Sequence, residues 1–218
     1  MSDYAVLDLF CGLGGFSQAF EESDRWHVTT VDIEARFEPD ICADVFDLRP
    51  SDFEAEFDVV LASPPCTHFT TANRITGWVG GKPQTEDARD SLALVYHALG
   101  LIHGLTPEYW FLENPRGGLR NHLPRPTGRV TYCQYGRKAQ KPTDLWGEHP
   151  PMTYRRCPQK ANCHVNHRGE RKNTQHLGDN SAERAKVPAE LSQAVRDACE
   201  AGLDGEVPEQ TTLEGINT

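Results

Sequence analysis

The run 57-FDVVLA-62 is largely apolar and stops abruptly at Ser-Pro-Pro-Cys. A short strand without regular polar alternation is typical of a parallel sheet that is covered on both faces. The sequence pattern predicts further strands at 4–10, 27–31, 109–112 and 129–133, and helices at 16–22, 86–104 and 188–199. Because strands and helices alternate along 218 residues, we expect one α/β domain with a mostly parallel sheet and helices on both faces.

Three chemically active side chains stand at or just beyond the ends of predicted strands. Asp32 ends the second strand, Cys66 follows the third and Glu113 ends the fourth. In a parallel α/β sheet, ligands bind beyond the carboxyl ends of the strands. We therefore expect these three residues to meet at one edge of the sheet.

A glycine-rich turn, 8-DLFCGLGGF-16, joins the first strand to a helix. Glycines in such a turn let backbone amides approach a ligand closely. The turn lacks both the spacing of a dinucleotide site and the lysine of a phosphate-binding loop. A carboxylate at Asp32 can accept both hydroxyls of a ribose, and Asp44 can take an adenine amino group. This combination favours a cofactor that contains a nucleoside but needs no demanding phosphate site.

Taken singly, the cysteine and the glutamate leave their roles open. Cys66 could be a buried, inert thiol in a loop stiffened by two prolines. Glu113 could be a solvated carboxylate, a structural ion-pair partner or a catalytic acid.

Four motifs in order resemble those of the DNA (cytosine-5)-methyltransferases, and in particular a short subgroup often carried by viruses. These motifs are 8-DLFCGLGGF-16, 31-VDIE-34, 63-SPPC-66 and 112-LENP-115, and TYCQYG and KPTDLW also fit the subgroup. The resemblance covers roughly residues 4–146, with a weaker match near 175–195. It implies a class I methyltransferase fold, which is Rossmann-like, with S-adenosylmethionine as the cofactor.

The resemblance also assigns roles to individual residues. It makes Cys66 the nucleophile and places Glu113 and Asn114 in the catalytic site. The residues that it implies for cofactor binding are Phe10, Gly12, Gly14, Gly15, Asp32, Ile33, Asp44 and Pro64, with Lys186 and Val187 at the border.

The reaction that the resemblance implies is methylation of carbon 5 of cytosine in DNA. Attack of the Cys66 thiolate on carbon 6 makes carbon 5 nucleophilic, and Glu113, kept partly protonated, assists at ring nitrogen 3. The target base has to leave the duplex stack, and the loop 67–84 could close over it. Methylation of tRNA, transfer of a modified group from a modified sulfonium, and a non-catalytic nucleic-acid-binding paralogue remain alternatives.

Three departures from the family pattern concern the binding regions. Thr67 follows the nucleophile where glutamine is usual, and 185-AKVPAEL-191 only echoes the C-terminal Gly-Asn-Ser-Val motif. The segment 140-QKPTD-144 stands where the family has Gln-x-Arg-x-Arg, whose arginines grip the base and the backbone. The candidates to take over that task are Arg137, Lys138 and Lys141.

Positive charge is concentrated in one part of an otherwise acidic chain. The net charge is −10, but residues 113–172 hold 13 Lys and Arg against 4 Asp and Glu. Such a basic segment favours double-stranded DNA as the partner. The candidates for contacts with base edges are Arg155, Arg156, Arg168 and Arg171, whereas most of the other basic residues would contact phosphates. Because few contacts fit into so short a segment, we expect a target site of about two to four base pairs.

The sequence predicts that the chain has four parts. They are a catalytic domain (1–146) that binds S-adenosylmethionine, a small basic target-recognition segment (147–174), a C-terminal helix returning to the catalytic domain (175–202) and a disordered tail (203–218). Seven scattered cysteines and the lack of a long apolar run or leader favour a cytoplasmic protein without a membrane partner, expected to be a monomer. No metal is predicted, because the spacing of Cys157, Cys163, His164 and His167 is not that of a standard zinc finger.

Overall fold

The computed structural model describes residues 3–70, 77–158 and 181–206. In chain order, the helices and strands of these residues are β1 Tyr4–Leu9, α1 Gln18–Glu21, β2 Trp26–Asp32, β3 Ile41–Cys42, β4 Val59–Ala62, β5 Trp78–Val79, β6 Lys82–Pro83, α2 Glu86–Leu105, β7 Tyr109–Pro115, β8 Gly128–Thr131, β9 Pro142–Trp146, α3 Ser181–Ala185 and α4 Ala189–Leu203.

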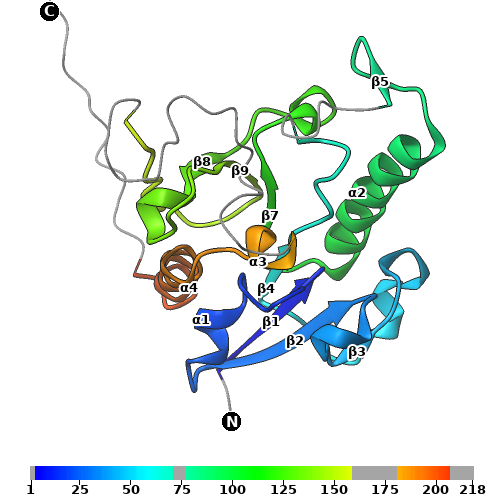
Figure 1. Ribbon diagram of the computed structural model, residues 1–218. Coiled ribbons are helices and arrows are strands. Elements are labelled where there is room, and N and C mark those ends of the chain that lie inside the picture. The colour runs from blue at the N-terminus through cyan, green and yellow to red at the C-terminus, as the bar shows by residue number, and fades with distance from the viewer. Residues whose placement is uncertain (1–2, 71–76, 159–180, 207–218) are drawn as a thin grey trace, which may run out of the picture.

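One sheet contains seven of these strands, in the order β3-β2-β1-β4-β7-β9-β8 (Figure 1). The strands from β3 to β7 are parallel, whereas β9 is antiparallel to both of its neighbours. The short strands β5 and β6 form a separate hairpin. The mostly parallel α/β sheet that the sequence predicted is therefore confirmed.

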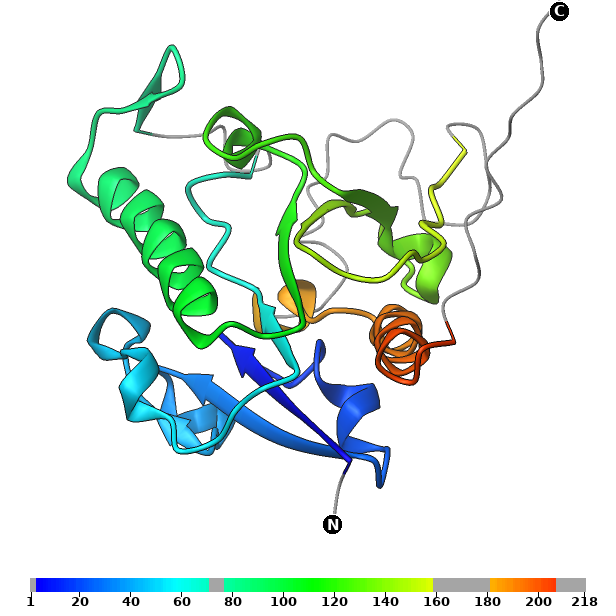
Figure 2. The same ribbon diagram turned by 180° about the vertical axis from the view of Figure 1, so that it is seen from behind.

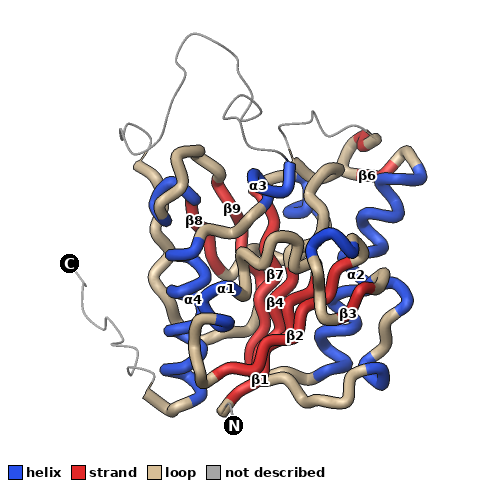
Figure 3. Tube along the Cα trace, turned by 60° about the horizontal axis from the view of Figure 1, so that its bottom comes forward, coloured by secondary structure: helices blue, strands red, loops and turns tan. Residues whose placement is uncertain are grey.

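Helices cover both faces of this sheet, with α1 and α4 on one side and α2 on the other (Figures 2 and 3). Successive side chains of a strand point to opposite faces of the sheet. The side chains of β1 therefore pack into the hydrophobic cores on both faces. Val6 packs in the core with Phe20 and Leu191, near α1 and α4. Leu7 packs in the opposite core with Ala98 of α2. The sheet is thus buried on both sides, which explains its apolar strands.

Helix α2 begins where the sequence predicted. The Thr85 hydroxyl accepts a hydrogen bond from the Ala88 N–H at 3.3 Å, and Glu86 and Asp87 in the first turn favour the helix dipole. The helix ends at Leu105, and the next residue, Thr106, has a left-handed φ of 51°. In the three described stretches, no helix combines the length and the apolar character that crossing a membrane requires.

Several elements differ from the prediction. The strand expected at 129–133 is β8 followed by a 3-10 helix, Tyr132–Tyr135, which ends at Gly136 with a φ of 83°. The strands β3 and β9 were not predicted, because two residues carry no period and β9 begins at Pro142. The first helix is shorter than expected, and α4 extends to Leu203 after an extended Pro188.

The described parts of the two C-terminal regions both contact the catalytic sheet or its helices. The Thr131 N–H donates to the Arg155 carbonyl at 3.0 Å, so this part of 147–174 lies beside the end of β8. The Ser192 hydroxyl of α4 accepts from the Ala19 N–H at 3.0 Å and donates to the Phe16 carbonyl at 2.6 Å. The division into four parts stays a prediction, and much of the second part and of the tail lies outside the described residues.

Candidate active site

The register of the sheet brings four segments to one edge. Leu9 of β1 pairs with Val31 of β2 and Ala62 of β4, and Ala62 pairs with Leu112 of β7. The connections after β1 and β4 lead to helices on opposite faces, and such a switch point is where α/β sheets bind ligands. The residues that follow the paired row are neighbours at this edge: Phe10, Asp32, Ser63 and Glu113.

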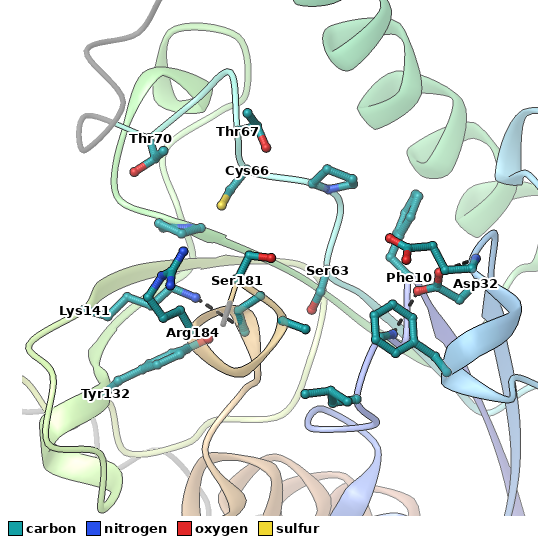
Figure 4. A pocket seen from close by; sticks show the side chains of 18 of the residues that line it. Phe10, Asp32, Ser63, Cys66, Thr67, Thr70, Tyr132, Lys141, Ser181 and Arg184 are labelled. Carbon is teal, nitrogen blue, oxygen red and sulfur yellow. Dashed lines mark hydrogen bonds between the residues drawn. The ribbon is translucent and has the colours of Figure 1, made fainter. Parts of the chain in front are cut away.

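A cavity of about 1120 Å³ opens at the same edge (Figure 4). Phe10 and Asp32 lie on one side of it, Tyr132 and Lys141 lie on the other, and Cys66 lies between them. Exposed apolar side chains also line it, namely Leu13, Ile33 and Phe46. Ile33 is 63% exposed, which is unusual for so apolar a residue and suits contact with a ligand ring.

The Asp32 carboxylate fixes the glycine turn. Its Oδ2 accepts from the Gly12 N–H and its Oδ1 from the Glu34 N–H, both at 2.9 Å. Gly12 and Gly14 have φ values of 51° and 64°, which glycine adopts without strain. Each carboxylate oxygen has a second lone pair, so Asp32 can still accept a hydroxyl from a ribose.

The turn also packs closely against the segment before α4. A Cβ atom on Gly15 would lie 2.5 Å from Lys186 Cγ and 2.7 Å from the Val187 nitrogen, so only glycine fits. Lys186 and Val187 line a smaller cavity beside Gly15 and Cys66. The two residues thus reach the border of the site, where the weak C-terminal motif placed them.

Asp44 lines the main cavity, but one of its oxygens is already engaged. It caps the 3-10 helix Val45–Asp47 by accepting from the Phe46 N–H at 3.0 Å. Contact with an adenine amino group stays a prediction for this residue. Phe46, which the sequence did not single out, is 42% exposed in the same wall.

The loop that carries Cys66 is fastened to the segment around β7 at two points. Asn114 Nδ2 donates to the Pro64 carbonyl at 3.0 Å, and the Gly118 N–H donates to the Phe69 carbonyl at 2.7 Å. Asn114 is fully buried, so its side chain positions the Pro-Cys loop. This gives a physical reason for an asparagine beside the glutamate.

Cys66 is half-buried, and burial raises the pKa of its thiol. The neighbouring Lys141 ammonium opposes this rise and lowers the pKa, whereas the Glu113 carboxylate adds to it. A thiolate is the nucleophilic form of cysteine, so the cation favours reactivity at this position.

Glu113 is only 4% exposed and has two partners on one oxygen. The Tyr132 hydroxyl donates to its Oε1 at 2.8 Å, and Lys141 Nζ lies 3.7 Å from the same atom. The phenol and the ammonium hold the carboxylate in place, and the role of Glu113 as a catalytic acid stays a prediction. Tyr132 was missed as a site residue, although it belongs to the TYCQYG motif.

The segment 140–144, which lacks the family's arginines, lies at the start of a strand of the sheet. Residues 142–146 form β9 inside the sheet, and the Asp144 side chain is only 1% exposed. Arg120 binds this carboxylate through two nitrogens, with Nε 2.5 Å from Oδ2. The charge of Asp144 is therefore paired within the protein.

The candidates for nucleic-acid contacts are differently placed. Arg137 donates to the Glu183 carbonyl, and Arg155 pairs with Glu190 at 3.0 Å and stacks over Tyr135. Lys138 and Arg156 are exposed, whereas Lys141 is directed into the cavity (Figure 4). Arg168 and Arg171 lie outside the described residues.

The question of a zinc site falls largely outside the described residues, because only Cys157 of its four candidate ligands lies within them. Over 3–70, 77–158 and 181–206, no group of three or more His, Cys, Asp or Glu side chains is arranged to hold a metal ion.

The strand order and the cavity at its switch point are those of a class I methyltransferase. Within that class, the chain belongs to the C-5 cytosine-specific DNA methylase family, which matches residues 4–128. Its reaction class is therefore S-adenosylmethionine-dependent methylation of cytosine in DNA. The glycine turn, the Asp32 carboxylate and the exposed Ile33 fit this cofactor in size and chemistry.

Known proteins resemble the chain to different extents. The "Probable DNA (cytosine-5)-methyltransferase" of Frog virus 3 is 30% identical over 72% of this chain and 77% of its own length. Type II methyltransferase M.XorII of Xanthomonas oryzae pv. oryzae is 27% identical, but the match spans 51% of this chain and only 28% of that protein. Among solved structures, TrmN from Thermus thermophilus is 19% identical with a TM-score of 0.40, covering 67% of this chain and 43% of TrmN.

Replacing Asp32 by alanine is expected to weaken S-adenosylmethionine binding by about 1–3 kcal/mol, or roughly 5- to 150-fold. The variant removes the acceptor offered to the ribose and strands the Gly12 and Glu34 N–H groups. Calorimetric titration with S-adenosylmethionine measures the change. Asp40→Ala is the matched control, because this exposed carboxylate accepts from the Thr30 backbone at 2.8 Å outside the cavity. Equal affinities of the Asp32→Ala variant and the parent would contradict the assigned role.

Proposed function

We propose that this protein methylates carbon 5 of cytosine in DNA through a covalent bond between Cys66 and carbon 6 of the base. The observation that carries the proposal is that one cavity is lined by Cys66, Tyr132 and Lys141 and also by Asp32 (Figure 4). A nucleophile, a cation and a nucleoside pocket therefore border one space in which both substrates could meet, and Glu113 lines the smaller cavity beside Cys66.

Cys66 would begin the reaction. Its thiolate adds to carbon 6, which breaks the aromaticity of the ring and gives carbon 5 the character of an enamine. S-adenosylmethionine, when bound, supplies the methyl group that carbon 5 takes up. A base then removes the carbon 5 proton, and the electron pair of that bond restores the double bond as Cys66 leaves.

Glu113 would act on the opposite side of the same ring. When Cys66 adds to carbon 6, electron density moves toward ring nitrogen 3, and a proton or hydrogen bond there lowers the barrier. The buried carboxyl group is held by Tyr132 and Lys141, so it has a defined position from which to meet the base. A cytosine can enter such a closed site only after it leaves the duplex stack.

DNA that contains 5-fluorocytosine in place of cytosine is expected to trap the enzyme covalently. Fluorine at carbon 5 cannot leave as a proton does, so the adduct on Cys66 cannot be resolved after methyl transfer. Mass spectrometry of the proteolysed complex should find the modified base on the peptide that contains Cys66.

Two comparisons make the trapping experiment decisive. A Cys66→Ser variant should form no adduct, and a parallel incubation of tRNA with tritiated S-adenosylmethionine should incorporate far less label than duplex DNA. Normal methylation of ordinary DNA without any trapped species would refute the covalent step. Labelling of tRNA instead of DNA would move the substrate to RNA.

A further inference from the structure

Tyr132 and Lys141 approach Glu113 from the same side. Tyr132 opens the 3-10 helix after β8, and Lys141 is the residue before β9. The Tyr132 N–H donates to the Lys141 carbonyl at 3.1 Å, which fixes the two residues relative to each other. Lys141 Nζ also lies 4.4 Å from the centre of the Tyr132 ring, within the range of a cation–π contact.

This pair faces the reacting side of the cavity. Tyr132 is 1% exposed, and the Lys141 side chain is 19% exposed. Both side chains are therefore more buried than a surface residue that contacts DNA phosphates. Lys141, Cys66 and Glu113 line the same smaller cavity, and Figure 4 shows Lys141 and Tyr132 beside the space below the Cys66 sulfur. The positive charge is thus close to both groups that would act on the base.

The neighbouring positions cannot supply this charge. Pro142 has no cationic side chain, and Asp144 is an anion that forms an ion pair with Arg120. Arg137 is directed to the Glu183 carbonyl. Among the described residues, Lys141 is the cation paired with Glu113, with its Nζ 3.7 Å from the carboxylate, and the same Nζ donates to the Ala185 carbonyl at 3.4 Å.

We propose that Lys141 is a catalytic residue that stabilises both the Cys66 thiolate and the negative charge developing on the pyrimidine, and that Tyr132 is a positioning residue for Glu113. This inference rests on the proposed function. A fixed cation in a water-poor site stabilises developing charge because it does not need to reorganise during the reaction. The Tyr132 hydroxyl stays a neutral donor, since burial and the Glu113 carboxylate raise its pKa well above that of a free phenol.

The first measurement is the pH dependence of Cys66 alkylation by iodoacetamide, read from the Cys66 peptide by mass spectrometry without cofactor or DNA. Lys141 lowers the pKa of Cys66, so Lys141→Met should move the alkylation midpoint upward by roughly one pH unit. Lys141→Arg should restore most of the shift. Lys82→Met is the matched control, because Lys82 is exposed on β6 and does not line the cavity, and it should leave the midpoint unchanged.

The second measurement is methyl transfer in a single turnover on duplex DNA. Lys141→Met should slow this step by about 100-fold, with DNA affinity changed less than about threefold. Tyr132→Phe, which removes only the hydroxyl, should slow it about tenfold and leave the alkylation midpoint nearly unchanged. Tyr135→Phe is its control, because that hydroxyl donates to the Thr153 carbonyl instead of Glu113.

The outcomes separate the two proposals. An unchanged alkylation midpoint in Lys141→Met, or a loss of DNA affinity with an unchanged transfer rate, would overturn the assignment of Lys141. Wild-type transfer by Tyr132→Phe would overturn the positioning role. If the unmodified enzyme fails to methylate any cytosine, the proposed function fails, and the alkylation measurement still decides whether Lys141 controls the thiol.

Discussion

Replacing Cys66 by serine is expected to reduce DNA methylation by on the order of 10⁴-fold or more, because a hydroxyl in this pocket is a far weaker nucleophile than a thiolate. Affinity for S-adenosylmethionine should stay within about threefold, since the cofactor's ribose is assigned to Asp32 on the other side of the cavity. Filter binding of labelled methyl groups on DNA measures the first quantity, and calorimetry measures the second.

Cys42→Ser serves as the control for the loss of a thiol, because Cys42 is exposed on β3. That variant should methylate DNA at close to the normal rate. Substantial turnover by Cys66→Ser would exclude the covalent route, whereas a parallel collapse of both cofactor affinity and folding would show that the substitution acts through the structure.

Replacing Arg120 by methionine is expected to lower the free energy of unfolding by about 3 kcal/mol. The Asp144 side chain is 1% exposed, so removal of Arg120 leaves a carboxylate buried without its bidentate partner. Chemical denaturation followed by circular dichroism measures the change. A loss well below about 1 kcal/mol would mean that Asp144 finds another partner or becomes protonated at little cost.

A double variant tests whether this cost comes from the stranded charge. Arg120→Met combined with Asp144→Leu removes both partners and replaces them with apolar groups, which is often close to neutral for buried ion pairs. The double variant should therefore recover much of the stability that the single variant loses. Failure to recover would point to packing around β9 as the origin of the loss.

The sequence predicted the parts of the fold that depend on local period and on strand ends. The apolar strands around Leu9 and Ala62 were recognisable because both of their faces are buried, and the register then places Asp32 and Glu113 at the same edge. Helix α2 was recognisable from the acidic residues in its first turn. These features are encoded within a few residues, so single-sequence patterns reveal them.

The parts that the sequence did not reveal depend on pairs that are distant along the chain. In the sequence, Asp144 stands where the family has an arginine. The residues around it in the sequence do not indicate that Arg120, 24 residues earlier, neutralises its charge. The contact between Tyr132 and Glu113 spans 19 residues and requires β9 to lie between β7 and β8. Such contacts are fixed by sheet topology, which local periodicity does not encode.

The packing of α4 against α1 and the first two strands has a consequence for how the chain folds as it is synthesised. The Tyr4 hydroxyl donates to Asp204 at 2.7 Å across 200 residues of sequence, and the Trp26 indole donates to Glu200 at 2.7 Å. Until α4 leaves the ribosome, the apolar face around Phe20 lacks its cover. Contacts of such high sequence separation slow folding and prolong exposure to aggregation. A nascent chain arrested before α4 should therefore hold its cofactor-binding strands in a form that chaperones recognise as incomplete.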